Sequence, residues 1–119
     1  MSDFNGPFLF PVHMDLLGKV FREALNSEGY GKIVRDFIES SESLDEEMMV
    51  LTYLDGFKET MSTFVELMDN YDDTGAFALA TEVSEKSHEP GAMMDMGFRG
   101  RVGAVRMFSR RAIEALEAS

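Results

Sequence analysis

Three residues in the second half of the chain have the types and spacing of a helical metal site. Glu82, Glu85 and His88 contain a Glu-x-x-His motif, which on a helix places a carboxylate and an imidazole on one face. Carboxylate-bridged di-iron bundles use two such motifs. Only one is present, because no glutamate stands three residues before His13. The alternatives are a metal or small-molecule site at Glu82, Glu85 and His88, or a solvated polar face. We favour the solvated face and expect no cofactor.

The segment from Asn70 to Thr81 partly matches a calcium-binding loop. Asp72, Thr74 and Gly75 occupy the third, fifth and sixth positions of such a loop. Thr81 stands at the twelfth position, where it cannot supply the bidentate carboxylate that calcium requires. We therefore interpret the segment as a turn between two helices with capping residues.

Gly97, Gly100 and Gly103, with arginines between them, are a weak match to a phosphate-binding loop. Their spacing is neither that of a dinucleotide fingerprint nor that of a Walker loop, and no predicted strand precedes them. We expect these glycines to pack closely against another helix or to mark a kinked helix start.

No set of residues in the sequence has the pattern of a catalytic site. His13 and Asp15 have the types of a base and of the carboxylate that orients it, but neither a nucleophile nor a second acid pair accompanies them. A capping or turn role for His13 is the simpler interpretation. The absence of cysteine excludes disulfides, thiolate metal sites and cysteine nucleophiles. We predict a protein that is not an enzyme.

Charge is distributed unevenly along the chain. Residues 36–73 contain twelve Asp or Glu and one Lys, Lys58, whereas residues 96–111 contain five Arg and no acid. The acids are either the solvent-exposed face of amphipathic helices or an anionic surface that binds a basic protein, for example one that handles nucleic acid. In the second case the protein is an acidic inhibitor or regulator. The residues of this predicted acidic face are Glu39, Glu42, Asp45, Glu46, Glu47, Asp55, Glu59, Glu66 and Asp69.

Three of the arginines are predicted to share one helix face. Arg99, Arg106 and Arg110 fall within about 40° of one another at 100° per residue. One interpretation is a nucleic-acid contact through Arg99 to Arg111. The net charge of −11 argues against it, as does the lack of interleaved aromatic residues. We favour an arginine stripe that faces the acidic third helix, within one subunit or across a symmetric dimer.

The ten methionines include candidates for an adaptable binding surface. We expect those of the central helix to fill the core, and Met93, Met94 and Met96 to be the better candidates for exposure.

Length and composition predict a single helical domain over residues 1–119 with one core. No apolar run approaches the roughly 20 residues of a membrane span, and no secretion signal is evident. We expect a soluble, cytoplasmic protein without a membrane partner, and a homodimer is an open alternative. No motif resembles a known family closely enough to name one.

Hydrophobic periodicity predicts an all-α compact bundle of about five helices around one long central helix at residues 44–71. Ser43 and Glu46 have the spacing of a capping box at its start. Gly56 in its middle indicates a close crossing with another helix or a bend. The remaining elements are an irregular Phe-rich arm at 1–11 and helices from about 14 to 28, 30 to 38, 76 to 89 and 98 to 116. An alternative is a dimer that exchanges the arm or the last helix.

Overall fold

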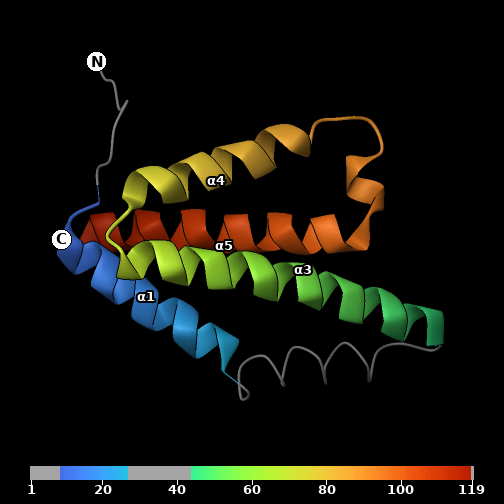
Figure 1. Cartoon of the computed structure of the whole chain (residues 1–119), viewed down its shortest axis with the longest axis horizontal. Helices are drawn as coiled ribbons and strands as arrows, with labels where there is room; N and C mark the ends of the chain where they lie inside the picture. The colour runs from blue at the N-terminus through green and yellow to red at the C-terminus, as the bar shows by residue number, and fades with distance from the viewer. Residues whose placement is uncertain (1–8, 27–43, 119) are drawn as a thin grey trace.

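The described part of the chain consists of helices joined by short turns. The computed structural model describes residues 9–26 and 44–118, and the side chains of all of these except 44–47 and 118. The helices are α1 (Pro11–Leu25), α3 (Leu44–Asp69), α4 (Asp73–Lys86) and α5 (Met96–Ala118), with a 3-10 turn, η1, at Ala92–Met94 (Figure 1). The predicted all-α fold is confirmed. The described residues contain four α-helices, and the further helix expected at 30–38 lies outside them.

The long helix α3 matches the predicted central helix except at its end. Its 26 residues extend over about 39 Å. It ends at Asp69 and not at residue 71, because Tyr71 has a positive φ of 54° and leaves the helical conformation. The N–H of Asp72 then donates to the carbonyl of Leu67 at 2.9 Å, which satisfies one of the last free carbonyls of α3. Ser43 and the side chain of Glu46 lie outside the described residues, so the predicted capping box stays a prediction.

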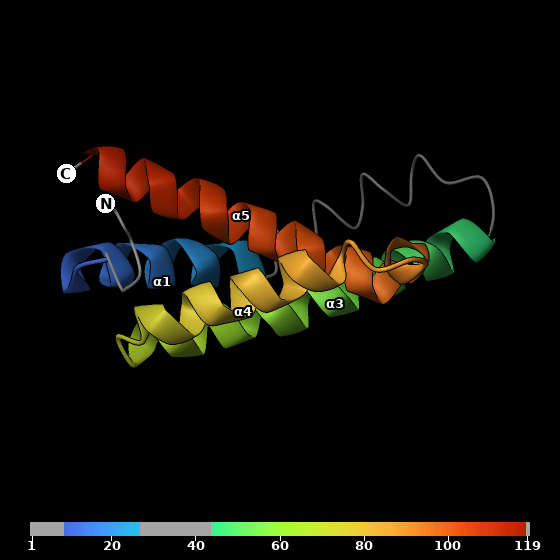
Figure 2. The same cartoon turned by 90° about the horizontal axis from the view of Figure 1, so that it is seen from above.

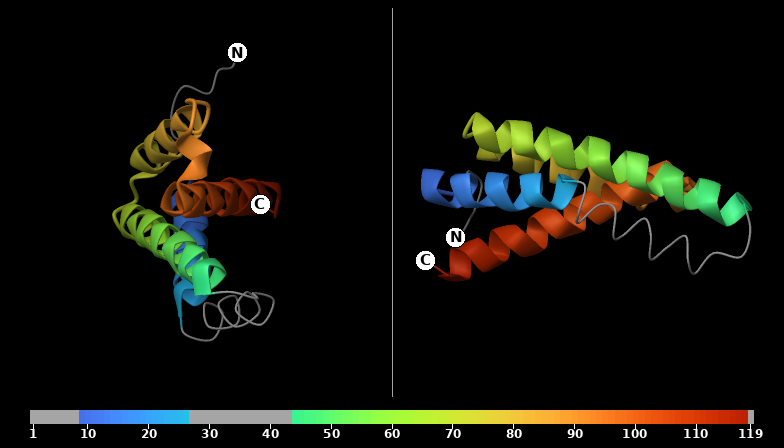
Figure 3. Two further views of the ribbon diagram at one scale, coloured as in Figure 1. Left: turned by 90° about the vertical axis from the view of Figure 1, so that its right-hand side faces the viewer. Right: turned by 90° about the horizontal axis from the view of Figure 1, so that it is seen from below.

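The helices form a bundle in which α3 and α5 run in the same direction and α1 and α4 run in the opposite direction (Figure 1). Near its start α5 crosses α3, and the two helices diverge toward the end of α5 (Figure 2). The space between their diverging halves is filled by α1, which packs on both (Figure 3). On the other side, α4 packs on α5 and on α3.

A cluster of phenylalanines joins the four helices in the core. Phe21 of α1, Phe64 of α3 and Phe108 of α5 are fully buried. The rings of Phe64 and Phe108 stack with 4.4 Å between centroids, and Phe77 of α4 meets Phe108 edge-on at 5.4 Å. Phe21 lies 6.1 Å from Phe108. Phe108 therefore contacts an aromatic ring from each of α1, α3 and α4.

The crossing of α3 and α5 is as close as Gly56 predicts. A Cβ on Gly56 would lie 1.9 Å from the carbonyl oxygen of Gly97, and a Cβ on Gly100 would lie 1.9 Å from that of Tyr53. Neither position can accept a larger residue unless the two backbones separate. The glycines of α5 thus pack against another helix, as predicted, and the phosphate-loop alternative is not needed to explain them.

The N-terminal arm ends earlier than expected, because α1 begins at Pro11 and not near Met14. Proline suits the first helical position, where its missing N–H is no loss. Of the two described arm residues, Leu9 is buried and its N–H donates to Oδ2 of Asp73 at 3.2 Å, while Phe10 is 66% exposed. No helix among the described residues combines the length and the apolar character that crossing a bilayer requires.

Candidate functional site

An open cleft of about 470 Å³ lies where α4 ends and α5 begins. It is bounded by α3, by the last residues of α4, by the segment around η1 and by the first turns of α5. The residues that line it are Thr52, Asp55, Gly56, Glu59, Lys86, Gly91, Ala92, Asp95, Gly97, Phe98 and Arg101. Charged groups of both signs therefore face one hollow.

The base of the cleft is held by backbone contacts and by a helix cap. Gly56 and Gly97 meet at the crossing of α3 and α5. Oδ1 of Asp95 accepts from the N–H groups of Gly97, at 2.9 Å, and Phe98, at 3.4 Å, so its carboxylate caps the start of α5. The guanidinium Nε of Arg99 donates to the carbonyl of Met93 and ties α5 to η1. These contacts fix where α5 starts relative to α3.

The two signs of charge come from different helices. Helix α3 supplies the exposed carboxylates of Asp55 and Glu59. Of the cationic residues, α4 supplies Lys86 and α5 supplies the half-buried Arg101. The ammonium of Lys86 lies 5.7 Å from the centre of the Phe98 ring, within the range of a cation–π contact. Among the described residues, no ion pair within 4.0 Å joins the two sets of charges.

The predicted acidic face is partly an exposed line on α3. Asp55, Glu59, Glu66 and Asp69 are all exposed. Asp69 is in an ion pair with Arg22 of α1, whereas the carboxylates of the other three have no ion pair in the part of the chain that the structure describes. Asp45, Glu46 and Glu47 belong to the first turn of α3, but their side chains are not described. Glu39 and Glu42 lie outside the described residues.

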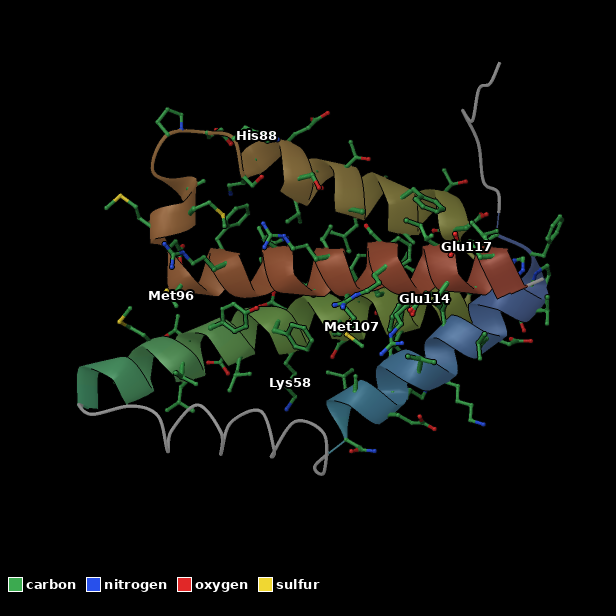
Figure 4. All side chains as sticks on the ribbon, turned by 180° about the vertical axis from the view of Figure 1, so that it is seen from behind. Lys58, His88, Met96, Met107, Glu114 and Glu117 are labelled. Atoms are coloured by element: carbon green, nitrogen blue, oxygen red, sulfur yellow. The ribbon has the colours of Figure 1, made fainter. Side chains whose placement is uncertain are left out.

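The predicted arginine stripe is an exposed face of α5. Arg99, Arg106 and Arg110 are exposed, as their spacing predicts. Within residues 9–26 and 44–118, none of them forms an ion pair with an acid of α3. Arg111 pairs with Glu114, and Figure 4 places Glu114 and Glu117 on the last turns of α5, so this end of the helix also carries acids. The expected contact with α3 in one subunit is not seen among these residues, and the dimer alternative stays a hypothesis.

The metal alternative requires a geometry that α4 does not provide. The helix ends at Lys86, so His88 lies in the turn beyond it and does not share a helix face with Glu85 (Figure 4). Glu82, Glu85 and His88 are all exposed. In the described part of the chain, no three His, Asp or Glu side chains gather closely enough to hold a metal ion. The prediction that Glu85 and His88 share one helix face is therefore wrong.

His13 and Asp72 have the structural roles that the sequence predicts. Nδ1 of the buried His13 accepts from the N–H of Phe10 at 3.1 Å, at the start of α1. Asp72 accepts from the N–H of Gly75 at 2.8 Å and so caps α4. The capping interpretations of both residues are confirmed.

The methionine prediction is correct only in part. Met61 and Met68 of α3 fill the core, and Met94 is 84% exposed. Met48 and Met49 of the same helix are exposed as well, which is contrary to the expectation. They precede the crossing of α3 with α5, so the first turns of α3 project beyond the core (Figure 1).

Three cleft residues, Lys86, Asp95 and Arg101, were missed by sequence reasoning. Asp95 had a usable signal, because an aspartate directly before a helical segment is a good N-cap. Lys86 and Arg101 had none, since only the crossing of α4 and α5 over α3 brings them to one hollow.

Comparison with protein-family models, with curated proteins and with solved structures finds no match to this chain.

Proposed function

We propose that this protein is a non-catalytic interaction protein, an inhibitor or regulator whose acidic face on α3 binds a basic protein partner. The observation that supports this most is the row formed by Asp55, Glu59 and Glu66. All three carboxylates are exposed, and they have no ion pair in the described part of the chain. They lie within about 40° around the helix and about 16 Å along it.

A rigid row of negative charge attracts a positively charged surface over a distance set by salt. The net charge of −11 adds to this attraction. At about 0.15 M salt the screening length is roughly 8 Å, so such recognition weakens steeply as salt rises. Charges of this kind mainly affect the association rate and the choice of partner, and they affect the final affinity less.

The test is affinity purification from the native host with three forms of the full chain. The first is the wild type, and the second carries Asp55→Asn, Glu59→Gln and Glu66→Gln. The third carries Glu82→Gln, Glu85→Gln and Glu89→Gln, which change the net charge by the same three units at exposed positions on and just after α4. We expect the wild type and the α4 variant to retain one basic protein at low salt, and the α3 variant to lose it.

Two outcomes would contradict the proposal. One is that the α3 variant retains the same partner as the wild type. The other is that the partner is retained unchanged between about 0.05 M and 0.5 M salt. The mass of each form in solution is measured in parallel. A wild-type dimer that the α3 variant cannot form would identify a second copy of this chain as the partner and would overturn the proposal of a different protein.

A further inference from the structure

We propose that the cleft between α3, the end of α4 and the start of α5 is a binding site for a small zwitterion of the amino-acid class. This proposal does not depend on the protein partner. It concerns the hollow itself, whose volume of about 470 Å³ is within the usual range of small-molecule sites.

The first argument is that residues of both charges line the same cleft. Asp55 and Glu59 on α3 offer two carboxylates to a cation, while Arg101 of α5 and Lys86 of α4 offer two cations to a carboxylate. These opposite charges do not pair with each other within 4.0 Å in the described part of the chain. A molecule that carries both an ammonium and a carboxylate, as an amino acid does on its Cα, satisfies groups of both charges at once. A simple cation or a simple anion satisfies only one and is repelled by the other.

The second argument is that the base of the cleft cannot close. Gly56 and Gly97 are already in backbone contact, which sets the distance between α3 and α5 at that point. Asp95 caps α5 through two N–H groups, so its charge is largely engaged in the helix start. The backbones from which Asp55, Glu59 and Arg101 project are therefore held in place before a ligand enters.

The third argument is the character of the remaining lining. The side chains of Phe98 and Ala92 give the cleft an apolar portion, and Gly91 leaves room where a side chain would otherwise project. Gly91 has a φ of 81° and nothing within 4 Å of the place where a Cβ would lie. Such a lining can accept an aliphatic side chain of modest size next to the two charged groups.

The experiment follows the backbone amide signals of Gly56, Gly91 and Gly97 in NMR spectra of the full chain. The probes are leucine, arginine and glutamate, each up to 10 mM. N-acetyl-leucine, which lacks the ammonium, and leucine amide, which lacks the carboxylate, are the matched controls. Gly75, in the turn between α3 and α4, reports on non-specific effects. We expect leucine to shift the three cleft signals saturably, while arginine and glutamate test which side chains the cleft accepts. We expect each blocked derivative of leucine to bind at least about tenfold more weakly than leucine.

Variants separate this site from the acidic face. Arg101→Gln, and the pair Asp55→Asn with Glu59→Gln, are expected to weaken binding about tenfold or more. Arg101→Lys keeps the charge and is expected to restore most of the binding. Glu66→Gln belongs to the acidic face but not to the cleft, and should leave zwitterion binding unchanged. A circular dichroism spectrum equal to that of the wild type shows that each variant is folded.

The proposal is overturned if leucine does not shift the cleft signals at 10 mM. It is also overturned if N-acetyl-leucine or leucine amide binds as tightly as leucine, because the site would then recognise one charge only. Partner capture with Arg101→Gln distinguishes the two proposals. If Arg101→Gln loses zwitterion binding and still captures the basic partner, the two binding activities depend on different residues. Because each proposal has its own readout, the failure of one leaves the other to be judged separately.

Discussion

The hydroxyl of Tyr71 donates a 2.7 Å hydrogen bond to Oδ1 of Asp15, which joins the turn after α3 to α1 across 56 positions of the sequence. Tyr71 holds a left-handed conformation, with a φ of 54°, that few residues other than glycine adopt readily. Tyr71 lies just after the end of α3, and this backbone conformation directs its side chain toward α1.

This bond predicts an altered titration of Tyr71. The hydrogen bond to Asp15 and, after it, the negative charge of the same carboxylate raise the pKa of Tyr71 above its ordinary value of 10.0. Because the folded-state pKa is the higher one, the contribution of this group to stability is complete below pH 10. It is lost as the pH rises through the folded-state pKa. The chain has three tyrosines, so ultraviolet titration of a Tyr30→Phe, Tyr53→Phe double variant isolates Tyr71.

Asp15→Asn is the control for this titration. It removes the charge while keeping a side-chain oxygen of similar size, and we expect the pKa of Tyr71 to fall toward 10.0 in the folded protein. An unchanged Tyr71 titration in that variant would contradict the role assigned to Asp15.

The close crossing of α3 and α5 predicts opposite effects for two glycine substitutions. Gly56→Ala places a Cβ 1.9 Å from the carbonyl oxygen of Gly97, so the helices must move apart. Overpacking of about 3 kcal/mol outweighs a helix-propensity gain of about 1 kcal/mol. Gly18→Ala meets only ordinary contacts, the nearest at 3.5 Å, and should gain up to about 1 kcal/mol. Urea unfolding of both variants measures the difference, and equal effects would contradict the close crossing.

Phe108 is predicted to be the most sensitive of the core aromatic residues. It is fully buried and contacts the rings of Phe21, Phe64 and Phe77. Phe108→Ala should lower the free energy of unfolding by about 3–5 kcal/mol, because it removes these contacts and leaves a cavity. Phe10→Ala serves as the control, since this ring is 66% exposed, and should change stability by less than about 0.5 kcal/mol. Thermal and urea denaturation measure the stability of the two variants. Similar losses in both would contradict the central role assigned to Phe108 in the core.

The buried carboxylate of Asp73 is predicted to anchor the end of the N-terminal arm. It accepts from the N–H of Leu9 across 64 positions, and Asp73→Ala leaves that buried donor without its partner. We expect a loss of about 1–3 kcal/mol. Asp73→Asn retains an acceptor oxygen and should lose less. Hydrogen exchange at the Leu9 amide reports the same bond directly, and similar protection of this amide in wild type and Asp73→Ala would count against the anchoring role.

Local sequence signals predicted the elements well where a single helix decides the outcome. The stepping of apolar residues by threes and fours located α3 and α5, and Asp72 near Gly75 indicated a capped turn. These features depend on residues within a few positions of one another. Errors occurred at helix ends and in the expected burial of Met48 and Met49. Tyr71 leaves the helix although it continues the apolar pattern, and α4 ends before His88 although the Glu-x-x-His spacing is helical.

The sequence by itself determined that the chain forms amphipathic helices, that Gly56 marks either a close helix crossing or a bend, and that acids and arginines occupy separate helical faces. Each of these follows from side-chain periodicity and size along one helix. Only the tertiary structure decided that α5 crosses at Gly56 with Gly97 as the neighbour, that Asp69 pairs with Arg22, and that Lys86 and Arg101 line the same cleft as Asp55 and Glu59. Those relationships depend on the angle and position at which helices cross. The crossing angles and positions depend on the simultaneous packing of side chains from several helices, so a local stretch of sequence does not determine them.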